Sequence, residues 1–178
     1  NKGQTNALLR NENIAVARSV ELAHAEPWDA IEISETVGMP CFVKPNETGS
    51  SLGMSRAETG AELAGAIALG RSVSTSGVLV ESLLEGREFT VGVVPDKHGK
   101  PTVLPVTEIT TERSFFDYEA KYQGASQETT PALIPKKQSD ALQAQALAVY
   151  RATQCRGMAR VAMIWTAPGV GYVTEVDA

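Results

Sequence analysis

Glycines, hydroxyl groups and a lysine are concentrated in the segment KPNETGSSLGMS, which begins at Lys44. Gly49 and Gly53 permit a loop whose backbone N–H groups point inward, and Ser50 and Ser51 add hydroxyl donors. Lys44 adds a positive charge at the end of an apolar run. Together these groups are suited to binding a triphosphate. The alternative is an ordinary Gly/Ser loop, because the segment matches neither the Walker A nor the GxGxxG pattern.

Two glutamates, Glu81 and Glu88, flank a short linker within the run VLVESLLEGREFTV. Backbone N–H and C=O groups between two strands can pair with the edge of a purine, and a nearby carboxylate can accept hydrogen bonds from ribose hydroxyls. This pattern suggests a nucleotide-binding linker. The alternative is that Glu81, Glu85 and Glu88 are solvated charges, which is the usual situation of glutamates.

A pair of carboxylates, Glu175 and Asp177, lies near the end of the sequence in a run that alternates like a strand. Side chains two residues apart in a strand project from the same face, so the pair could hold Mg²⁺ against substrate phosphates. Arg160, near the start of the expected neighbouring strand, could stabilise a developing anion. The alternative is that Glu175 and Asp177 are ordinary acidic residues on the exposed face of a terminal hairpin.

An aromatic cluster, FFDYEAKYQG, lies inside a long polar stretch from Glu108 to Pro135. Lys121 and Tyr122 in this cluster are suited to closing over a charged reactant and excluding water, as a lid does. The alternative is local packing that fastens the loop to the body of the protein.

Hydrophobic periodicity and turn residues predict the elements that must position these groups. We expect helices at 4–11, from Pro27 to a stop at Gly38, from a Thr59/Glu62 capping box to a stop at Gly70, and from a Ser139 cap to near Gly157. We expect strands within 14–22, at 41–44, at 77–81 buried on both faces, in a hairpin through 89–93 and 102–106, and at 159–166 and 170–176.

Composition excludes several classes of protein. The chain has 178 residues, 43% hydrophobic and 21% charged, which is typical of a globular protein. Its formal net charge of −5 argues against a nucleic-acid partner. No apolar run approaches the length of a membrane span, so we expect neither a secretion signal nor a membrane partner. Cys41 and Cys155, without CxxC spacing, predict a reducing compartment and no zinc site.

In their order along the chain, these segments resemble the D-alanine:D-alanine ligases of the ATP-grasp superfamily. The resemblance covers essentially the whole chain and also involves Asn1-Lys2, CRGMARV and the terminal TEVDA. It depends most on YEAKY together with KPxxxGSSxGMS. It implies an α+β ATP-grasp fold with two α/β lobes and an ATP cleft between them. Residues 1–84 would be the central lobe, with the phosphate loop and hinge. Residues 85–178 would be the C-terminal lobe, with the lid and metal site, truncated at its end.

The resemblance also implies an activity. ATP would phosphorylate one D-alanine, and the amine of a second D-alanine would attack the acyl phosphate, for peptidoglycan precursor synthesis in the cytoplasm. Lys2 and Lys44 would bind the ATP phosphates, with Ser50 and Ser51 over the transferred group. Glu81, Ser82, Leu83 and Leu84 would form the adenine hinge, Glu88 would hold the ribose, and Lys121 would reach the γ-phosphate. Tyr122 with Ser50 would order the second substrate, Arg160 would stabilise the oxyanion, and Glu175 with Asp177 would bind Mg²⁺, which Mn²⁺ could replace.

The sequence departs from the family pattern at Ala162, where the pattern has an aspartate, and at Asp177, where it usually has asparagine. It also lacks the preceding domain and the following Thr-x-Pro-Gly loop, so we expect a portion of a longer enzyme that could be a homodimer when complete. Two other functions stay open: a nucleotide-binding module without ligase activity, and another ATP-grasp carboxylate:amine ligase.

Overall fold

The computed structural model describes residues 1–49, 51–111, 126–167 and 169–178. The chain divides into two compact units. The first unit consists of Asn1–Asn6 and Ala17–Leu84, and the second of Ala7–Val16 and Glu85–Ala178. The chain thus changes units after Leu84, where the sequence suggests a boundary, but also twice near the N-terminus. The lobe assignment and the ATP cleft remain predictions.

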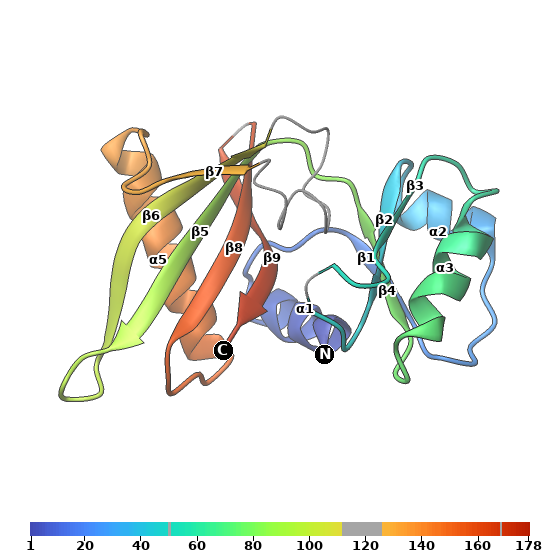
Figure 1. The fold of residues 1–178 in the computed structure, drawn as a ribbon, viewed down its shortest axis with the longest axis horizontal. Coiled ribbons are helices and arrows are strands. Elements are labelled where there is room, and N and C mark those ends of the chain that lie inside the picture. The colour runs from blue at the N-terminus through green and yellow to red at the C-terminus, as the bar shows by residue number, and fades with distance from the viewer. Residues whose placement is uncertain (50, 112–125, 168) are drawn as a thin grey trace. The chain divides into compact units, whose positions relative to one another are not determined.

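The first unit contains an antiparallel sheet with the strand order β1-β4-β2-β3. Its strands are β1 (Ser19–Leu22), β2 (Cys41–Pro45), β3 (Ser55–Ala57) and β4 (Val78–Ser82). Two helices, α2 (Ala30–Val37) and α3 (Leu63–Ser72), cover one face of this sheet (Figure 1). Val43 and Val80 point toward the helices and join the core of the unit. Because side chains alternate along a strand, Lys44 and Glu81 lie on the opposite face.

The second unit contains an antiparallel sheet with the order β7-β6-β5-β8-β9. Its strands are β5 (Arg87–Pro95), β6 (Pro101–Thr111), β7 (Ser126–Thr129), β8 (Ala159–Thr166) and β9 (Val170–Asp177). Helix α5 (Lys136–Ala152) lies along one face of this sheet (Figure 1). Phe89, Val91 and Met163 pack with α5 in the core. Helix α1 (Lys2–Asn11) starts in the first unit and contributes Leu9 to this second core.

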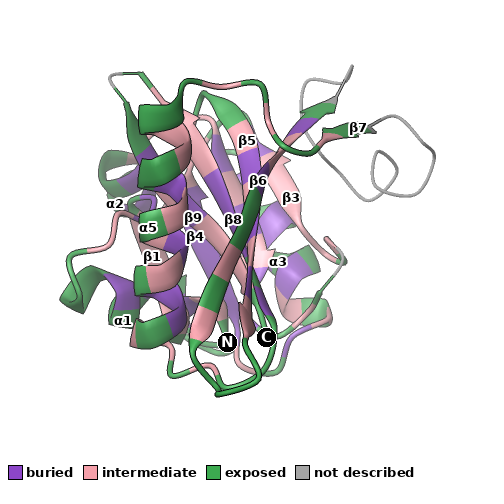
Figure 2. Ribbon diagram, turned by 90° about the vertical axis from the view of Figure 1, so that its left-hand side faces the viewer, coloured by how far each residue is buried: buried purple, intermediate pink, exposed green. Residues whose placement is uncertain are grey.

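The predicted apolar stripes of the helices are confirmed. Leu63, Ala66 and Ile67 of α3 are buried. On α5 the predicted Leu142, Ala146, Val149 and Tyr150 are all buried, while other positions of that helix are exposed (Figure 2). The strand at 77–81 is also confirmed, because Val78–Glu81 of β4 are all buried.

Several predicted boundaries are wrong. Helix α2 does not start at Pro27, because the Asp29 side chain accepts hydrogen bonds from two following N–H groups and so caps the helix there. Helix α5 starts after Pro135 without a side-chain cap, so Ser139 lies inside it, and it ends at Ala152, before Gly157. Helix α3 starts after Glu62 instead of after Thr59 and runs past Gly70.

Two other expectations are modified and a third is confirmed. Of the run 14–22, Ser19–Leu22 forms the strand, and Val16 makes an isolated parallel bridge to Val173. The stretch from Glu108 to Pro135 is not a continuous loop, because β7 pairs with the end of β6. The predicted stop of α2 at Gly38 is confirmed, since Gly38 has a φ of 77°.

Candidate functional site

Lys44 and Glu81 form an ion pair on the face of the first sheet opposite α2 and α3, which the start of α1 also contacts through Asn6. The strand register places Lys44 opposite Leu79 and Glu81 opposite Phe42, so Lys44 and Glu81 are diagonal neighbours. The Lys44 Nζ to Glu81 Oε2 distance is 2.6 Å, and the two side chains are 16% and 6% exposed. Asn6 of α1 donates from Nδ2 to the other Glu81 oxygen at 2.6 Å. Both Glu81 oxygens therefore accept hydrogen bonds from this protein.

This geometry limits what Glu81 can do in the expected hinge. Its carboxylate is buried with Lys44 and Asn6, so any contact from this residue to an adenine would involve its main chain. Ser82, the last residue of β4, donates its N–H to Arg18 O at 2.9 Å. Leu83 and Leu84 lie in the connection that follows. The hinge assignment remains a prediction.

Lys2 lies close to the segment that follows β2. Its Nζ donates to the carbonyl oxygens of Pro45 at 3.0 Å and Thr48 at 2.5 Å. Further along this loop Ser51 has a φ of 59° and Gly53 a φ of 72°. The loop folds back on itself through a hydrogen bond from Met54 N to Ser51 O at 3.1 Å. A lysine and a Gly/Ser loop thus lie together, as the phosphate-site prediction requires.

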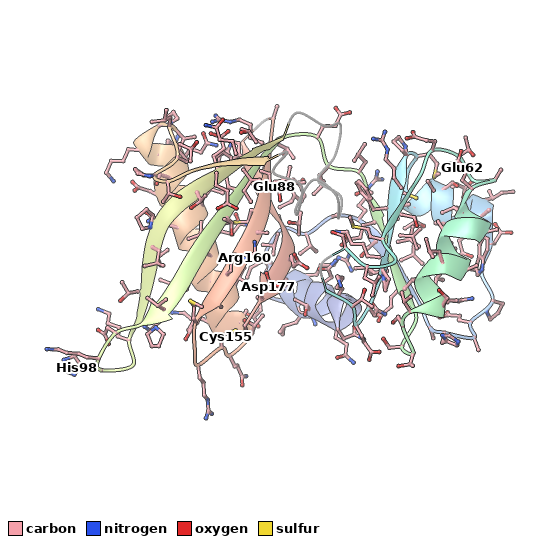
Figure 3. All side chains as sticks on the ribbon, viewed as in Figure 1. Glu62, Glu88, His98, Cys155, Arg160 and Asp177 are labelled. Atoms are coloured by element: carbon pink, nitrogen blue, oxygen red, sulfur yellow. The ribbon has the colours of Figure 1, made fainter. Side chains whose placement is uncertain are left out.

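Four predicted site residues of the second unit share one face of its sheet. Glu88, next to the core residue Phe89, points away from α5, and it pairs with Ile109 and Ile164. In the same register Arg160 lies opposite Asp177, and Ala162 lies opposite Glu175. Glu88, Arg160, Glu175 and Asp177 therefore project from the face that α5 does not cover, and Figure 3 labels three of them.

Arg160 and Asp177 form an ion pair across β8 and β9, with side chains about half exposed (Figure 3). Both groups are thus accessible, but each neutralises the other. Glu175 faces the methyl group of Ala162, whose neighbour on the other side is Thr90. Among the described residues there is no group of three or more His, Cys, Asp or Glu side chains placed to hold a metal ion.

The donor set fits magnesium, because Mg²⁺ prefers oxygen ligands and is commonly held by one or two carboxylates together with substrate phosphates. Glu175 and Asp177 supply two carboxylates on one face. A metal at this position would compete with Arg160 for Asp177. The metal assignment of the two residues remains a prediction.

Sequence reasoning missed two buried amides, Asn6 and Asn46, which are 7% and 1% exposed. Asn46 is part of the KPNETGSSLGMS segment, but an asparagine next to Gly and Ser indicates only a turn. Asn6 lies 75 positions from the glutamate it contacts, and no local pattern predicts such a pairing. Ser50, Lys121 and Tyr122 lie outside the described residues, so their predicted roles stay as stated.

Solved structures with a similar fold define the class of protein. The D-Ala:D-Ser ligase VanG from Enterococcus faecalis aligns with a TM-score of 0.84 and 31% identity, over 99% of this chain and 51% of that one. A D-alanine–D-alanine ligase from Bacillus anthracis aligns with a TM-score of 0.82 and 32% identity, over 99% and 55%. Another structure of the Bacillus anthracis enzyme, in complex with ATP, aligns with a TM-score of 0.78. The chain has the ATP-grasp fold of these ligases.

Sequence comparison then gives the family. A family model described as "D-ala D-ala ligase C-terminus" matches residues 8–178. The D-alanine–D-alanine ligase of Flavobacterium johnsoniae is 40% identical over 160 residues, which are 90% of this chain and 49% of that protein. That of Flavobacterium psychrophilum is 39% identical over 177 residues, 99% of this chain and 53% of that protein. The chain belongs to the D-alanine:D-alanine ligase family. It spans about half the length of these relatives.

Among the described residues, no helix is both long and apolar enough to cross a membrane.

Proposed function

We propose that this chain supplies the ATP-binding part of an enzyme that joins two D-alanines into D-alanyl-D-alanine for peptidoglycan precursor synthesis in the cytoplasm. The carboxylate of the first D-alanine attacks the γ-phosphorus of ATP, forming an acyl phosphate and releasing ADP. The amine of the second D-alanine then attacks the acyl carbon, and phosphate leaves. The observation that carries the proposal is the Lys44–Glu81–Asn6 cluster beside the Gly/Ser loop and Lys2, in a member of this ligase family.

Lys44 and Lys2 are the phosphate-binding groups of this proposal. Phosphoryl transfer depends mainly on positioning and on neutralising the charge of the phosphates. Glu81, whose other oxygen accepts from Asn6, holds the Lys44 ammonium at the end of β2, while Pro45 O and Thr48 O hold that of Lys2. Both lysines are thereby restricted before the nucleotide binds, which reduces the side-chain entropy lost on binding.

The other residues keep the roles that family membership suggests. Ser82, Leu83 and Leu84, with the main chain of Glu81, line the adenine hinge, and Glu88 holds the ribose. Ser50, Ser51 and Lys121 contact the transferred phosphoryl group, and Tyr122 orders the second substrate with Ser50. Arg160 stabilises the oxyanion when it is released from Asp177. Glu175 and Asp177 would hold Mg²⁺, which would supply positive charge against the phosphates. A homodimer of the full-length protein is also proposed.

The test is ADP release by the full-length protein with D-alanine as the only amino acid. We expect Lys44→Ala to raise the KM for ATP at least about tenfold, because a charge-assisted phosphate contact is lost. Lys136→Ala is the matched control, since Lys136 is 86% exposed and pairs with Asp140 on α5, away from the proposed site. Equal effects of the two substitutions would contradict the proposed role of Lys44.

A second candidate differs in the acceptor amino acid. The similarity to VanG, a D-Ala:D-Ser ligase, favours measuring ADP release with D-alanine plus D-serine, D-lactate or L-amino acids. Faster turnover with D-serine or an L-amino acid than with D-alanine alone would replace the first proposal with another ATP-grasp carboxylate:amine ligase, and faster turnover with D-lactate would indicate a ligase that forms an ester.

A third candidate, a nucleotide-binding module without ligase activity, is favoured by Ala162, which faces Glu175 where a further carboxylate could stand. Activity gained by Ala162→Asp in the full-length protein would identify a damaged ligase. ATP binding without turnover in both forms would support the module.

A further inference from the structure

Asn46, the residue that follows β2, connects three separate segments of the first unit while being 1% exposed. Its N–H donates to Gly77 O at 3.1 Å, and its carbonyl accepts from Lys2 N at 3.0 Å. Its side-chain Oδ1 accepts from Gly3 N at 3.1 Å, and its Nδ2 donates to Glu21 Oε1 at 3.0 Å. Its backbone and side-chain polar groups are thus all engaged, which is expected of a buried amide.

The start of helix α1 depends on this residue. The first N–H groups of a helix have no partner within the helix and need an acceptor from elsewhere. Asn46 supplies acceptors for Lys2 N and Gly3 N, while Asn1 Oδ1 accepts from Gln4 N at 3.1 Å. The Lys2 ammonium also reaches Pro45 O and Thr48 O. Lys2 is therefore fixed at both its backbone and its side-chain end to the segment around Asn46.

Glu21 determines the orientation of the Asn46 amide. A carboxylate only accepts hydrogen bonds and a backbone N–H only donates them, so Nδ2 must face Glu21 and Oδ1 must face Gly3. Gly3 makes room for this arrangement, because a Cβ at that position would lie 2.1 Å from the carboxyl carbon of Glu21. The amide is thus held in one orientation from both sides.

We infer that Asn46 is a positioning residue for ATP binding, which acts by holding Lys2 at the Gly/Ser loop. The inference depends on the proposed function, because it assumes that Lys2 binds the nucleotide. Asn46 itself contacts only groups of this protein, and its effect on the nucleotide passes through Lys2.

The test is Asn46→Asp in the full-length protein, with KM for ATP, kcat and the melting temperature measured together. Aspartate keeps the acceptor for Gly3 N but places a second carboxylate against Glu21. We expect the KM for ATP to rise about tenfold, because the hydrogen bond from Asn46 to the Glu21 carboxylate is lost. We expect kcat to change little. Asn13→Asp is the matched control, because it adds the same charge at an exposed position where a φ of 58° suits both residues.

A second substitution distinguishes positioning from general destabilisation. In Asn46→Asp with Glu21→Gln the glutamine amide can donate to the new carboxylate, so we expect the KM for ATP to return close to the wild-type value. Asn46→Ala is measured in parallel as a variant that adds no charge and is expected to raise the KM for ATP. A fall in melting temperature with an unchanged KM in both single variants would overturn the inference.

Combination with Lys2→Ala separates this inference from the proposed function. If Asn46 acts through Lys2, the increases in KM from Lys2→Ala and Asn46→Asp will not multiply in the double variant. Multiplying effects would overturn the inference and leave the role of Lys2 intact. An unchanged KM in Lys2→Ala alone would contradict the role of Lys2 and the inference together.

Discussion

At the scale of single residues, the burial of the Glu81 carboxylate explains the arrangement at the end of β2. A buried carboxylate is tolerated only when it is paired and hydrogen-bonded, and Lys44 with Asn6 meets both conditions. Removing one member of such a group leaves the others buried and unpaired. The ion pair therefore contributes to the stability of the first unit as well as to the proposed phosphate site.

We predict that Glu81→Gln destabilises the protein by about 2–3 kcal/mol, because the largely buried Lys44 ammonium loses its counter-charge. Asp140→Asn is the control, since it breaks the exposed Lys136–Asp140 pair on α5 and is expected to change stability by less than about 0.5 kcal/mol. Urea denaturation measures both variants. Similar small losses would show that the Lys44–Glu81 pair contributes no more than a surface pair.

We predict that the two free cysteines differ in reactivity. Burial raises the pKa of the Cys41 thiol, so the reactive thiolate is disfavoured in the folded state. Cys155 is partly exposed. A thiol reagent at about pH 8 should label Cys155 first and Cys41 only as the first unit opens, since thiolate is the nucleophile. Mass spectrometry of the labelled peptides measures this order, and equal rates in native protein would contradict it.

At the scale of elements, the sequence predicted most of the strands and the apolar stripes of the helices, because both depend on local periodicity, but it missed the short strands β3 and β7. It failed at helix ends. Ser139 looks like an N-cap, yet α5 starts at Lys136. Gly70 looks like a helix stop, yet α3 continues to Ser72, and Gly70 packs against β4. A glycine required for close packing and a glycine that ends a helix are indistinguishable in one sequence.

We predict opposite effects of alanine at the two glycines of α3. A Cβ at Gly70 would lie 2.6 Å from Val78 Cγ1 in the core, so Gly70→Ala should destabilise the protein by about 1–3 kcal/mol through overpacking. A Cβ at Gly65 meets nothing within 4 Å, so Gly65→Ala should stabilise it by about 0.5–1 kcal/mol through the better helix propensity of alanine. Thermal melting measures both. A destabilising Gly65→Ala or a neutral Gly70→Ala would contradict this account of α3.

At the scale of the whole molecule, the proposed site residues are divided between the two units. Lys2, Lys44 and Glu81 belong to the first unit, and Glu88, Arg160, Glu175 and Asp177 belong to the second. Lys2 lies on α1, Lys44 and Glu81 lie on the sheet face opposite α2 and α3, and the residues of the second unit lie on the sheet face opposite α5. The order of the motifs in the sequence was enough to predict the ATP-grasp class. It did not predict that Ala7–Val16 joins the second unit, because that depends on Leu9 packing and on the Val16–Val173 bridge.

The most direct test of the central claim is calorimetric titration of ATP into the full-length protein, with and without Mg²⁺, for the wild type and Lys44→Ala. We predict that Mg²⁺ strengthens ATP binding and that Lys44→Ala weakens it at least about tenfold. The reason is that Mg²⁺ and the Lys44 ammonium each neutralise charge on the phosphates. Absence of ATP binding to the folded wild-type protein, or equal binding by the Lys44→Ala variant, would contradict the assignment of this chain as the ATP-binding part of a ligase.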